Sequence, residues 1–299
     1  MKRSSVIILV LFVLGLALAL GLSYLSHFRV KQEATAKGPQ RILCAVPNVA
    51  EIVFALGQGD RVAGVSDFTT YPPEAAAKEK IGGYINPNLE RIIALQPDLV
   101  IVIGLWEKLS KLCEEKGIPL MRMEIEDLAG LYASIGTIGE ALGCEAEARQ
   151  LVEEIKGQLD EVRKKAAAQP LKPKVFLCMS RLEGSLENLS TVGTGGFLGE
   201  LIEIAGGVNL FADVTERYPS ISKEALMRRM PEVIVELRPE DVSHTRPVEE
   251  IKADWLDLPM LPAVATNRVY VVTDDYIKIA GPRIGKTAER LYELFKGAP

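Results

Sequence analysis

The stretch NLERIIALQPDLVIV, from Asn88 to Val102, decides the fold because its pattern returns later in the chain. The second copy, SKEALMRRMPEVIVE, runs from Ser222 to Glu236. In each copy a helix-capping residue precedes a glutamate by two positions, and a proline follows that glutamate by seven. An acid and a run rich in β-branched residues come next. Duplication of a whole lobe explains the repeat most simply and predicts a two-lobed molecule with a cleft.

A second pair of segments repeats in the same order. Ala50–Gly57 resembles Gly199–Gly206, with a glutamate six residues before a glycine in each. A short apolar strand is predicted before each copy, at Arg41–Val46 and at Lys174–Met179. Alternation of strands and helices can make α/β proteins look self-similar, but two motifs in the same order favour duplication.

The composition excludes several classes of function. The chain has 299 residues, enough for two domains, with a formal net charge of −5 and a pI near 5.4. This acidic balance argues against nucleic-acid binding, which needs a basic face. The chain has two histidines, His27 and His244, so we expect no metal site built from clustered histidines and no cofactor.

The N-terminus predicts export. We interpret residues 1–28 as a signal peptide or a membrane anchor, because basic residues precede an uncharged apolar run at 6–22. Ala17–Ala19 is an acceptable cleavage site, whereas the length of the run is also sufficient to span a bilayer. Residues 29–40 are predicted to be a polar tether. Either interpretation places the remainder outside the cytoplasm. The anchor interpretation also holds it at the outer face of the membrane through residues 6–22.

The four cysteines form no C-x-x-C motif. Cys44 and Cys178 fall within predicted buried strands, where a thiol acts as a small apolar group. Pairing of Cys113 with Cys144 is open to an exported protein, but the spacing alone does not decide it.

Short apolar strands alternate with helices in both halves, which predicts an α/β fold with parallel sheets. We place an N-terminal lobe at 41–144, a linking helix at 145–171 and a C-terminal lobe at 172–299. The linking helix has apolar residues at helical spacing among charged ones, so it is predicted to be one long rigid element. The predicted strands are Ile42–Val46, Val62–Val65, Leu99–Ile103, Leu120–Met123, Val175–Met179, Val233–Leu237 and Val269–Val272.

From about residue 41 onward the chain resembles the helical-backbone class of periplasmic substrate-binding proteins of ABC importers. The matching stretches are Tyr71–Glu74, Gly82–Arg91, Leu95–Leu99, Gly206–Asp213 and Gly281–Arg283. The resemblance implies two Rossmann-like lobes joined by one long backbone helix, with the ligand in a cleft between them. It implies a small-molecule metal chelate as ligand (a corrinoid, a ferric siderophore or haem) and an ABC permease dimer with its ATPase subunits as partner. We expect a monomer.

Glu90 and Glu224 occupy equivalent positions in the two copies of the repeat. Each is expected in the first turn of a helix, where a carboxylate favours the helix dipole by about 0.3–1 kcal/mol. The resemblance implies a further role, in which each glutamate docks into an arginine pocket of the permease. Carboxylate–arginine pairs are directional, so two of them would fix the orientation of docking.

The ligand is expected to contact loops at the strand ends of both lobes. Aromatic rings there would stack on a flat ligand, and guanidinium groups would meet anionic groups. Cobalamin binders of this family often have tryptophan at positions 84 and 276, where this chain has tyrosine. The predicted ligand-binding residues are Tyr71, Tyr84, Trp106, Arg181, Tyr218, Tyr276 and Arg283.

Two other functions use the same two-lobed fold. One is an exported α/β enzyme, but the chain has no G-x-G-x-x-G after its first strand and no G-x-S-x-G, so we predict no catalytic residues. The segment Gly193–Gly196 lacks the lysine and spacing of a P-loop and is interpreted as a turn that opens a helix. The other alternative is a membrane-tethered sensor. The leading prediction is a receptor that delivers a chelate to a permease.

Overall fold

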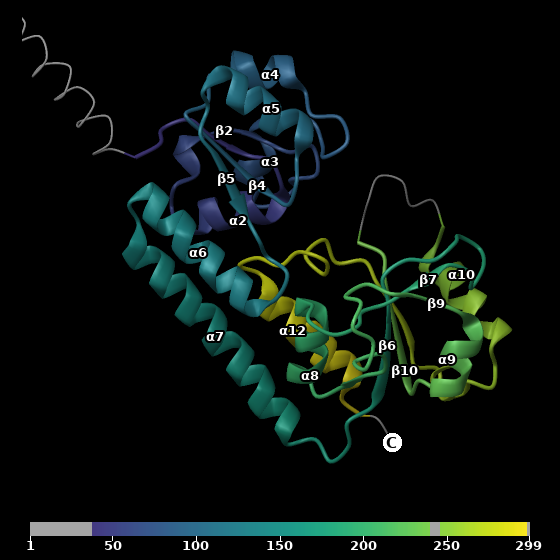
Figure 1. The fold of residues 1–299 in the computed structure, drawn as a ribbon. Helices are drawn as coiled ribbons and strands as arrows, with labels where there is room; N and C mark the ends of the chain where they lie inside the picture. Colours follow the sequence, from purple (N-terminus) through teal and green to yellow (C-terminus); the bar gives the residue numbers. More distant parts are fainter. Residues whose placement is uncertain (1–37, 240–245, 298–299) are drawn as a thin grey trace, which may run out of the picture.

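The structure is a computed structural model that describes residues 38–239 and 246–297 (Figure 1). The predicted signal peptide or anchor at 1–28 lies outside the described residues, as does the predicted tether up to residue 37. Within the described ranges, no helix combines the length and apolar character needed to cross a membrane.

The N-terminal lobe (N-lobe) is built on a parallel sheet with the strand order β3-β2-β1-β4-β5. Its strands are short, and the central ones are almost fully buried, as expected for a parallel sheet covered on both faces. The strands are β1 (Ile42–Cys44), β2 (Val62–Val65), β3 (Glu79–Lys80), β4 (Leu99–Ile103) and β5 (Leu120–Met123). The helices of this lobe are α2 (Pro47–Ala55), η1 (Gly59–Arg61), α3 (Pro73–Ala76), α4 (Leu89–Ala94) and α5 (Glu107–Lys116).

The C-terminal lobe (C-lobe) contains a second parallel sheet, with the order β11-β10-β6-β8, and a small antiparallel pair β7-β9. Its strands are β6 (Lys174–Cys178), β7 (Leu189–Ser190), β8 (Val208–Asn209), β9 (Ser220–Ile221), β10 (Val233–Leu237) and β11 (Val269–Val272). Its helices are α8 (Phe197–Ile204), α9 (Lys223–Arg229), α10 (Val248–Ala253), η2 (Asp254–Asp257), α11 (Pro262–Ala265) and α12 (Ile284–Phe295).

The two sheets share one topology. Along the N-lobe sheet the order β2-β1-β4-β5 corresponds to β8-β6-β10-β11 in the C-lobe, strand for strand. The repeated motif occupies the same place in both, because α4 leads into β4 and α9 leads into β10. The shared strand order agrees with the duplication expected from the sequence.

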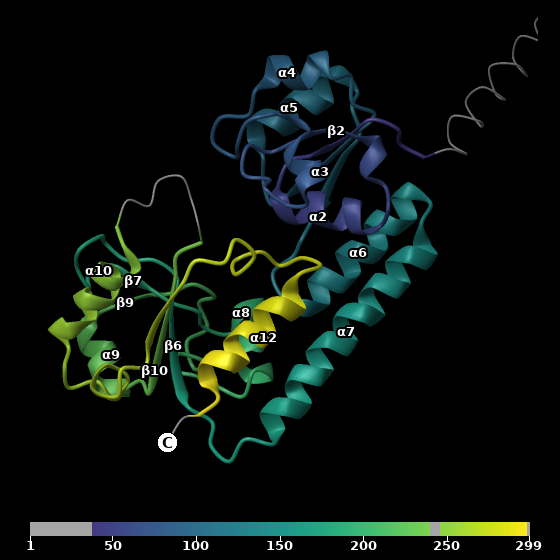
Figure 2. The ribbon, with the colours of Figure 1, turned by 180° about the vertical axis from the view of Figure 1, so that it is seen from behind.

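Two long helices connect the lobes. α7 (Glu145–Ala167) is the predicted linking helix, and α6 (Leu128–Leu142) lies alongside it as the first arm of a helical hairpin (Figure 2). α6 begins at its cap Asp127, whose carboxylate accepts a hydrogen bond from the amide of Gly130 at 2.6 Å. A Cβ built on Gly139 of α6 would lie 2.4 Å from the Cβ of Ala148, so glycine is required where the two helices approach.

The hairpin joins the cores of the lobes into one hydrophobic cluster. Buried residues of α6 and α7 belong to the same cluster as the strands β1 and β6 and the helices α8 and α12. The cluster includes Leu131 and Ile135 of α6, Ile155 and Leu159 of α7, Leu201 of α8 and Leu291 of α12. Because a close-packed interior resists deformation, the lobes are held by packing as well as by the chain.

The carboxyl edges of the two sheets face each other. The chain leaves β5 and reaches the C-lobe at once, where the carbonyl of Glu126 accepts a hydrogen bond from the amide of Phe197 at 2.9 Å. The loop that leaves β11 returns to the N-lobe through Arg283. Ligands of parallel α/β sheets bind beyond the carboxyl ends of the strands, so the site is expected where these edges meet.

Candidate functional site

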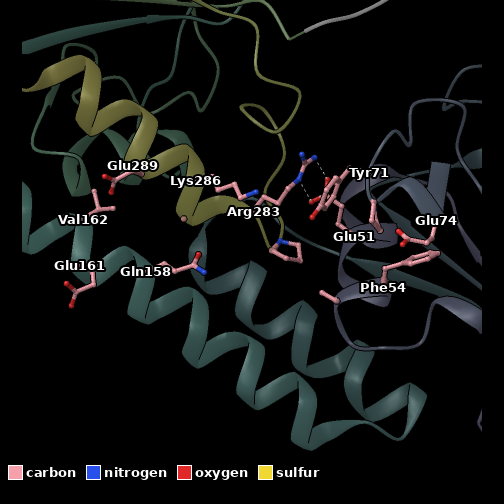
Figure 3. Close-up of a pocket in the computed structure, with 14 residues that line it drawn as sticks. Glu51, Phe54, Tyr71, Glu74, Gln158, Glu161, Val162, Arg283, Lys286 and Glu289 are labelled. Carbon is pink, nitrogen blue, oxygen red and sulfur yellow. Dashed lines mark hydrogen bonds and ion pairs between the residues drawn. The ribbon is translucent and has the colours of Figure 1, made fainter.

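A buried ion pair joins the lobes beside the linking hairpin. Arg283, at the start of α12, donates to both carboxylate oxygens of Glu51 on α2, at 2.9 Å from Nε and 2.6 Å from Nη2 (Figure 3). Glu51 is 3% exposed and Arg283 8%. Burial raises the pKa of Glu51, although the guanidinium opposes this shift through its hydrogen bonds and its charge. We call this contact the interlobe ion pair.

Two of the predicted ligand-binding tyrosines surround the guanidinium of Arg283. The ring of Tyr71 lies 4.1 Å from its central carbon, and the ring of Tyr276 lies 5.5 Å away. Its remaining nitrogen, Nη1, binds both oxygens of Asp275 at 2.9 Å. The structure thus brings Tyr71, Tyr276 and Arg283 together, but protein groups already occupy the guanidinium.

A cavity of about 840 Å³ opens between the lobes at this point. The N-lobe contributes residues of α2 and the Tyr71–Glu74 segment, the C-lobe contributes the start of α12, and α7 lines one side (Figure 3). This volume falls within the range of small-molecule sites in proteins.

The carboxyl edge of the N-lobe sheet exposes apolar side chains. Tyr84 is 60% exposed and packs edge-on against Trp106, with the ring centroids 5.1 Å apart. Trp106 is only 4% exposed and donates its indole N–H to the carbonyl of Ile103 at 3.0 Å. Both line a groove of about 360 Å³, so Trp106 supports Tyr84 from beneath.

Three further residues extend this surface. Ile85 and Leu105 line the same groove and are 83% and 72% exposed. Phe68, 63% exposed, lies against Gly83, since a Cβ built there would meet its ring at 2.7 Å. We call Phe68, Tyr84, Ile85 and Leu105 the apolar patch. Exposed apolar groups gathered in this way are typical of binding surfaces.

Arg181 lies apart from both groups. Its side chain is fully buried in the C-lobe, where Nε donates to both oxygens of Glu236 at 3.0 and 3.1 Å. Its other nitrogens bind the carbonyls of Ser185 and Ile251 and the carboxylate of Asp254. Protein groups bind every nitrogen of this buried guanidinium, so we do not include Arg181 among the proposed ligand contacts.

Two cations lie at the carboxyl edge of the C-lobe sheet. Arg238 follows β10 and donates from Nε to Glu236 at 2.7 Å, with its side chain 15% exposed. Lys278 donates from Nζ to the carbonyl of Met179, at the end of β6, at 2.7 Å. Burial lowers the pKa of Lys278, and the charge of Arg238 lowers it further. Lys278 lies in the loop that precedes Arg283, and no local sequence signal indicated Arg238.

Tyr218 lies near the crossing between the lobes. It is 41% exposed, and its hydroxyl would be 3.8 Å from a Cβ built on Gly196. The neighbouring Arg217 forms an ion pair with Glu126 of the connection between β5 and α6. Tyr218 is therefore placed at the lobe junction but not beside Tyr71 or Tyr276.

Glu90 and Glu224 hold equivalent positions, one on each lobe. Both are exposed, in the first turns of α4 and α9, and the caps Asn88 and Ser222 accept backbone N–H bonds at 2.9 and 3.2 Å. A hydrogen bond from Ser222 holds the pKa of Glu224 below its usual value. The two helices lie on different lobes and both are remote from α7 (Figures 1 and 2).

Cysteines and metal-binding groups add little to the site. Cys113 and Cys144 are both buried and free, on α5 and at the cap of α7, so they are not paired. In the part of the chain that the structure describes, no group of three or more histidine, cysteine, aspartate or glutamate residues could hold a metal ion.

Sequence reasoning did not single out Glu51 as a site residue, although the repeat contained the signal. Its counterpart Glu200 accepts a hydrogen bond from the amide of Leu128, the first residue of α6, at 3.1 Å. Each repeated glutamate thus holds an element outside its own lobe. In this chain, the two glutamates that repeat in both halves, Glu51 and Glu200, bond outside their own lobes. Their repetition is the sequence feature that indicated the lobe junction.

Known proteins share this architecture. Residues 42–276 match the periplasmic binding protein family. The chain is 31% identical to an uncharacterized ABC transporter substrate-binding lipoprotein, YvrC of Bacillus subtilis, over 86% of this chain and 80% of that protein. It is 30% identical to a vitamin B12-binding protein of Vibrio campbellii, over 81% of this chain and 84% of the relative.

The periplasmic heme-binding protein RhuT of Roseiflexus, solved in its apo form, has the same fold. It superposes with a TM-score of 0.73 at 26% identity, over 87% of this chain and 99% of RhuT. The family match, the relatives and the two parallel-sheet lobes joined by α7 agree, and the chain belongs to the periplasmic binding protein family, in its helical-backbone class of ABC importer substrate-binding proteins.

Proposed function

We propose that this protein captures a metal chelate outside the cytoplasm and delivers it to the permease of an ABC importer. The observation that carries the proposal is the apolar patch, which lies at a sheet edge that faces the other lobe in a chain of this family. A bulky, partly flat chelate would cover these side chains, and the aromatic rings would supply a stacking surface. The role requires binding and release but no catalysis.

The proposed ligand contacts come from both lobes. Tyr71, Tyr84 and the underlying Trp106 serve on the N-lobe, and Tyr218 and Tyr276 serve on the C-lobe. Arg283 fixes the relative position of the two lobes through the interlobe ion pair. Its guanidinium is already bound by Glu51 and Asp275. In this proposal it shapes the site and does not bind an anionic ligand group directly.

The proposed partner is a permease dimer with its ATPase subunits, contacted through Glu90 and Glu224. Both side chains are exposed, and each belongs to a capped helix that would hold it in place. The proposed location is the outer side of the cell membrane, with residues 6–22 as a signal or an anchor.

Uptake in cells tests this function. A strain that lacks the gene is supplied with radiolabelled ferric siderophores, haem and cobalamin, one at a time. We expect uptake of one chelate class to fall and to return with the wild-type gene. Normal uptake of every class in the deletion strain, with no rival binding protein induced, would contradict the proposal.

A further inference from the structure

The two facing edges differ in chemistry. At the N-lobe edge, the apolar patch offers Phe68, Tyr84, Ile85 and Leu105 to the space in front of the sheet. At the C-lobe edge, Arg238 and Lys278 stand where β10 and β6 end. A ligand bridging these edges therefore meets apolar surface on one side and positive charge on the other.

The cations behind the C-lobe edge share their carboxylate partners. Arg181 and Arg238 share the single carboxylate of Glu236, which also accepts from the indole of Trp255 at 2.8 Å. Asp254 is shared between Arg181 and Arg246. Arg246 also pairs with Glu250, at 3.6 Å. Among the described residues, Glu236 is the carboxylate that pairs with Arg238 and acts on Lys278, and it is shared with Arg181.

Donor capacity remains on both cations. Among the described residues, Arg238 has a partner for Nε alone, which leaves both terminal nitrogens of its guanidinium available. The ammonium of Lys278 has the carbonyl of Met179 as its partner and retains two further N–H donors. A partly buried cation favours an anion more strongly than an exposed one, because less water screens the interaction.

Resting on the proposed function, we propose that the ligand is an amphipathic anion, with its anionic oxygens on Arg238 and Lys278 and its apolar body on the apolar patch. Carboxylate and catecholate oxygens share the required chemistry, since both accept charge-assisted hydrogen bonds. A neutral chelate would offer no charged acceptor to the remaining N–H donors of the two cations. The arrangement thus selects a charge class and fixes the orientation of the ligand between the lobes.

Equilibrium titration of the full-length protein with matched chelate pairs tests this proposal. One pair is haemin and its dimethyl ester, and the other is an iron(III) tris-catecholate complex and a neutral ferric trihydroxamate. We expect the anionic member of one pair to bind at least about tenfold more tightly than its neutral partner. Which pair shows the difference distinguishes carboxylate from catecholate as the source of the anionic oxygens.

Variants assign the effect to the two side chains. Arg238→Gln combined with Lys278→Gln should weaken the anionic chelate about a hundredfold and the neutral one less than about threefold. The matched control removes two exposed charges elsewhere, as Arg149→Gln with Lys172→Gln, and should change neither affinity. Raising the salt concentration should weaken binding of the anionic chelate to the wild type. This test does not depend on whether the variants fold.

Each outcome decides a different claim. If the neutral chelates bind the wild type as tightly as the anionic ones, or the double variant keeps its anionic affinity, the charge assignment is overturned and the proposed function stands. If no chelate of either kind binds the wild type, the proposed function fails and this inference fails with it.

Discussion

Glu51 and Arg283 are 232 residues apart in sequence, yet their side chains form a two-point ion pair that closes the base of the lobe junction. Both groups are buried, and Arg283 is also held by Asp275 and by the ring of Tyr71. A contact with so many partners fixes the angle between the lobes. The linking hairpin, which has no loop in the span of α7, restrains the same angle.

Breaking the interlobe ion pair should destabilise the protein and loosen the lobes. Arg283→Ala leaves the carboxylate of Glu51 buried without its cation, at a cost of about 3–5 kcal/mol in the free energy of unfolding. The double variant Glu51→Gln, Arg283→Gln should cost less, because no charge is left unpaired. Urea denaturation of the single and double variants measures both values, and equal losses would contradict the pairing.

Charge reversal of the docking residues should abolish uptake and spare ligand binding. Glu90→Lys with Glu224→Lys replaces two exposed carboxylates whose helices keep the caps Asn88 and Ser222. Ligand affinity should stay within about twofold, because neither residue lies at the lobe junction. The control is Glu145→Lys with Glu249→Lys, which reverses first-turn acids of α7 and α10. Normal uptake by the docking variant would refute the docking role.

Removing the aromatic rings should weaken ligand binding from both lobes. Tyr84→Ala and Tyr276→Ala each remove stacking area, which is expected to raise the dissociation constant about fivefold to tenfold. Tyr84→Phe keeps the ring on Trp106 and should bind almost as the wild type does. Calorimetric titration of the three variants compares these values. Unchanged affinity in both alanine variants would remove the two tyrosines from the site.

Binding of an anionic chelate should weaken at alkaline pH. The pKa of Lys278 lies below the ordinary 10.5 because of burial, and a bound anion would raise it. The affinity for the anionic chelate is therefore highest at pH values below the lowered pKa of Lys278, and it declines as the pH rises through that pKa. The neighbouring Cys178 thiol does not produce this decline, because burial raises its pKa to about 12.

A lysine-to-arginine variant isolates the titrating group. Lys278→Arg keeps a cation across the alkaline range, so its affinity for the same chelate should not decline between neutral pH and about pH 10. Titrations at matched ionic strength measure both proteins. A decline of equal size in both would show that a different group titrates.

Local patterns were sufficient to predict the longer strands and the repeat, but not every helix or the two-residue strands β3, β7, β8 and β9. Runs of β-branched residues such as Leu99–Ile103 predict buried strands by composition alone. α6 escaped prediction because Gly130, Gly136 and Gly139 each lower helix propensity by about 1 kcal/mol relative to alanine. Packing against α7 compensates for this loss, and Gly139 is the residue that makes the close packing possible.

The candidate site depends on pairings that no local pattern contains. Arg181 was predicted at the ligand because of its type and its place after β6, but Glu236, 55 residues later, buries its guanidinium. Arg283 was predicted because of its type and its place in the loop after β11, and its partner Glu51 comes from the other lobe. Tyr84 was predicted because it lies in a stretch that matches the family, and the structure leaves its side chain exposed.

A direct titration of the purified protein tests the central claim, that the lobes capture a bulky metal chelate. Haemin, cobalamin and ferric siderophores of both charge classes are added in turn, together with bare Fe³⁺, Mn²⁺ and Zn²⁺ as controls. The account predicts saturable binding of at least one chelate at one molecule per chain, with no tight binding of the bare ions. Failure of every chelate to bind, or tight binding of a bare metal ion, would contradict it.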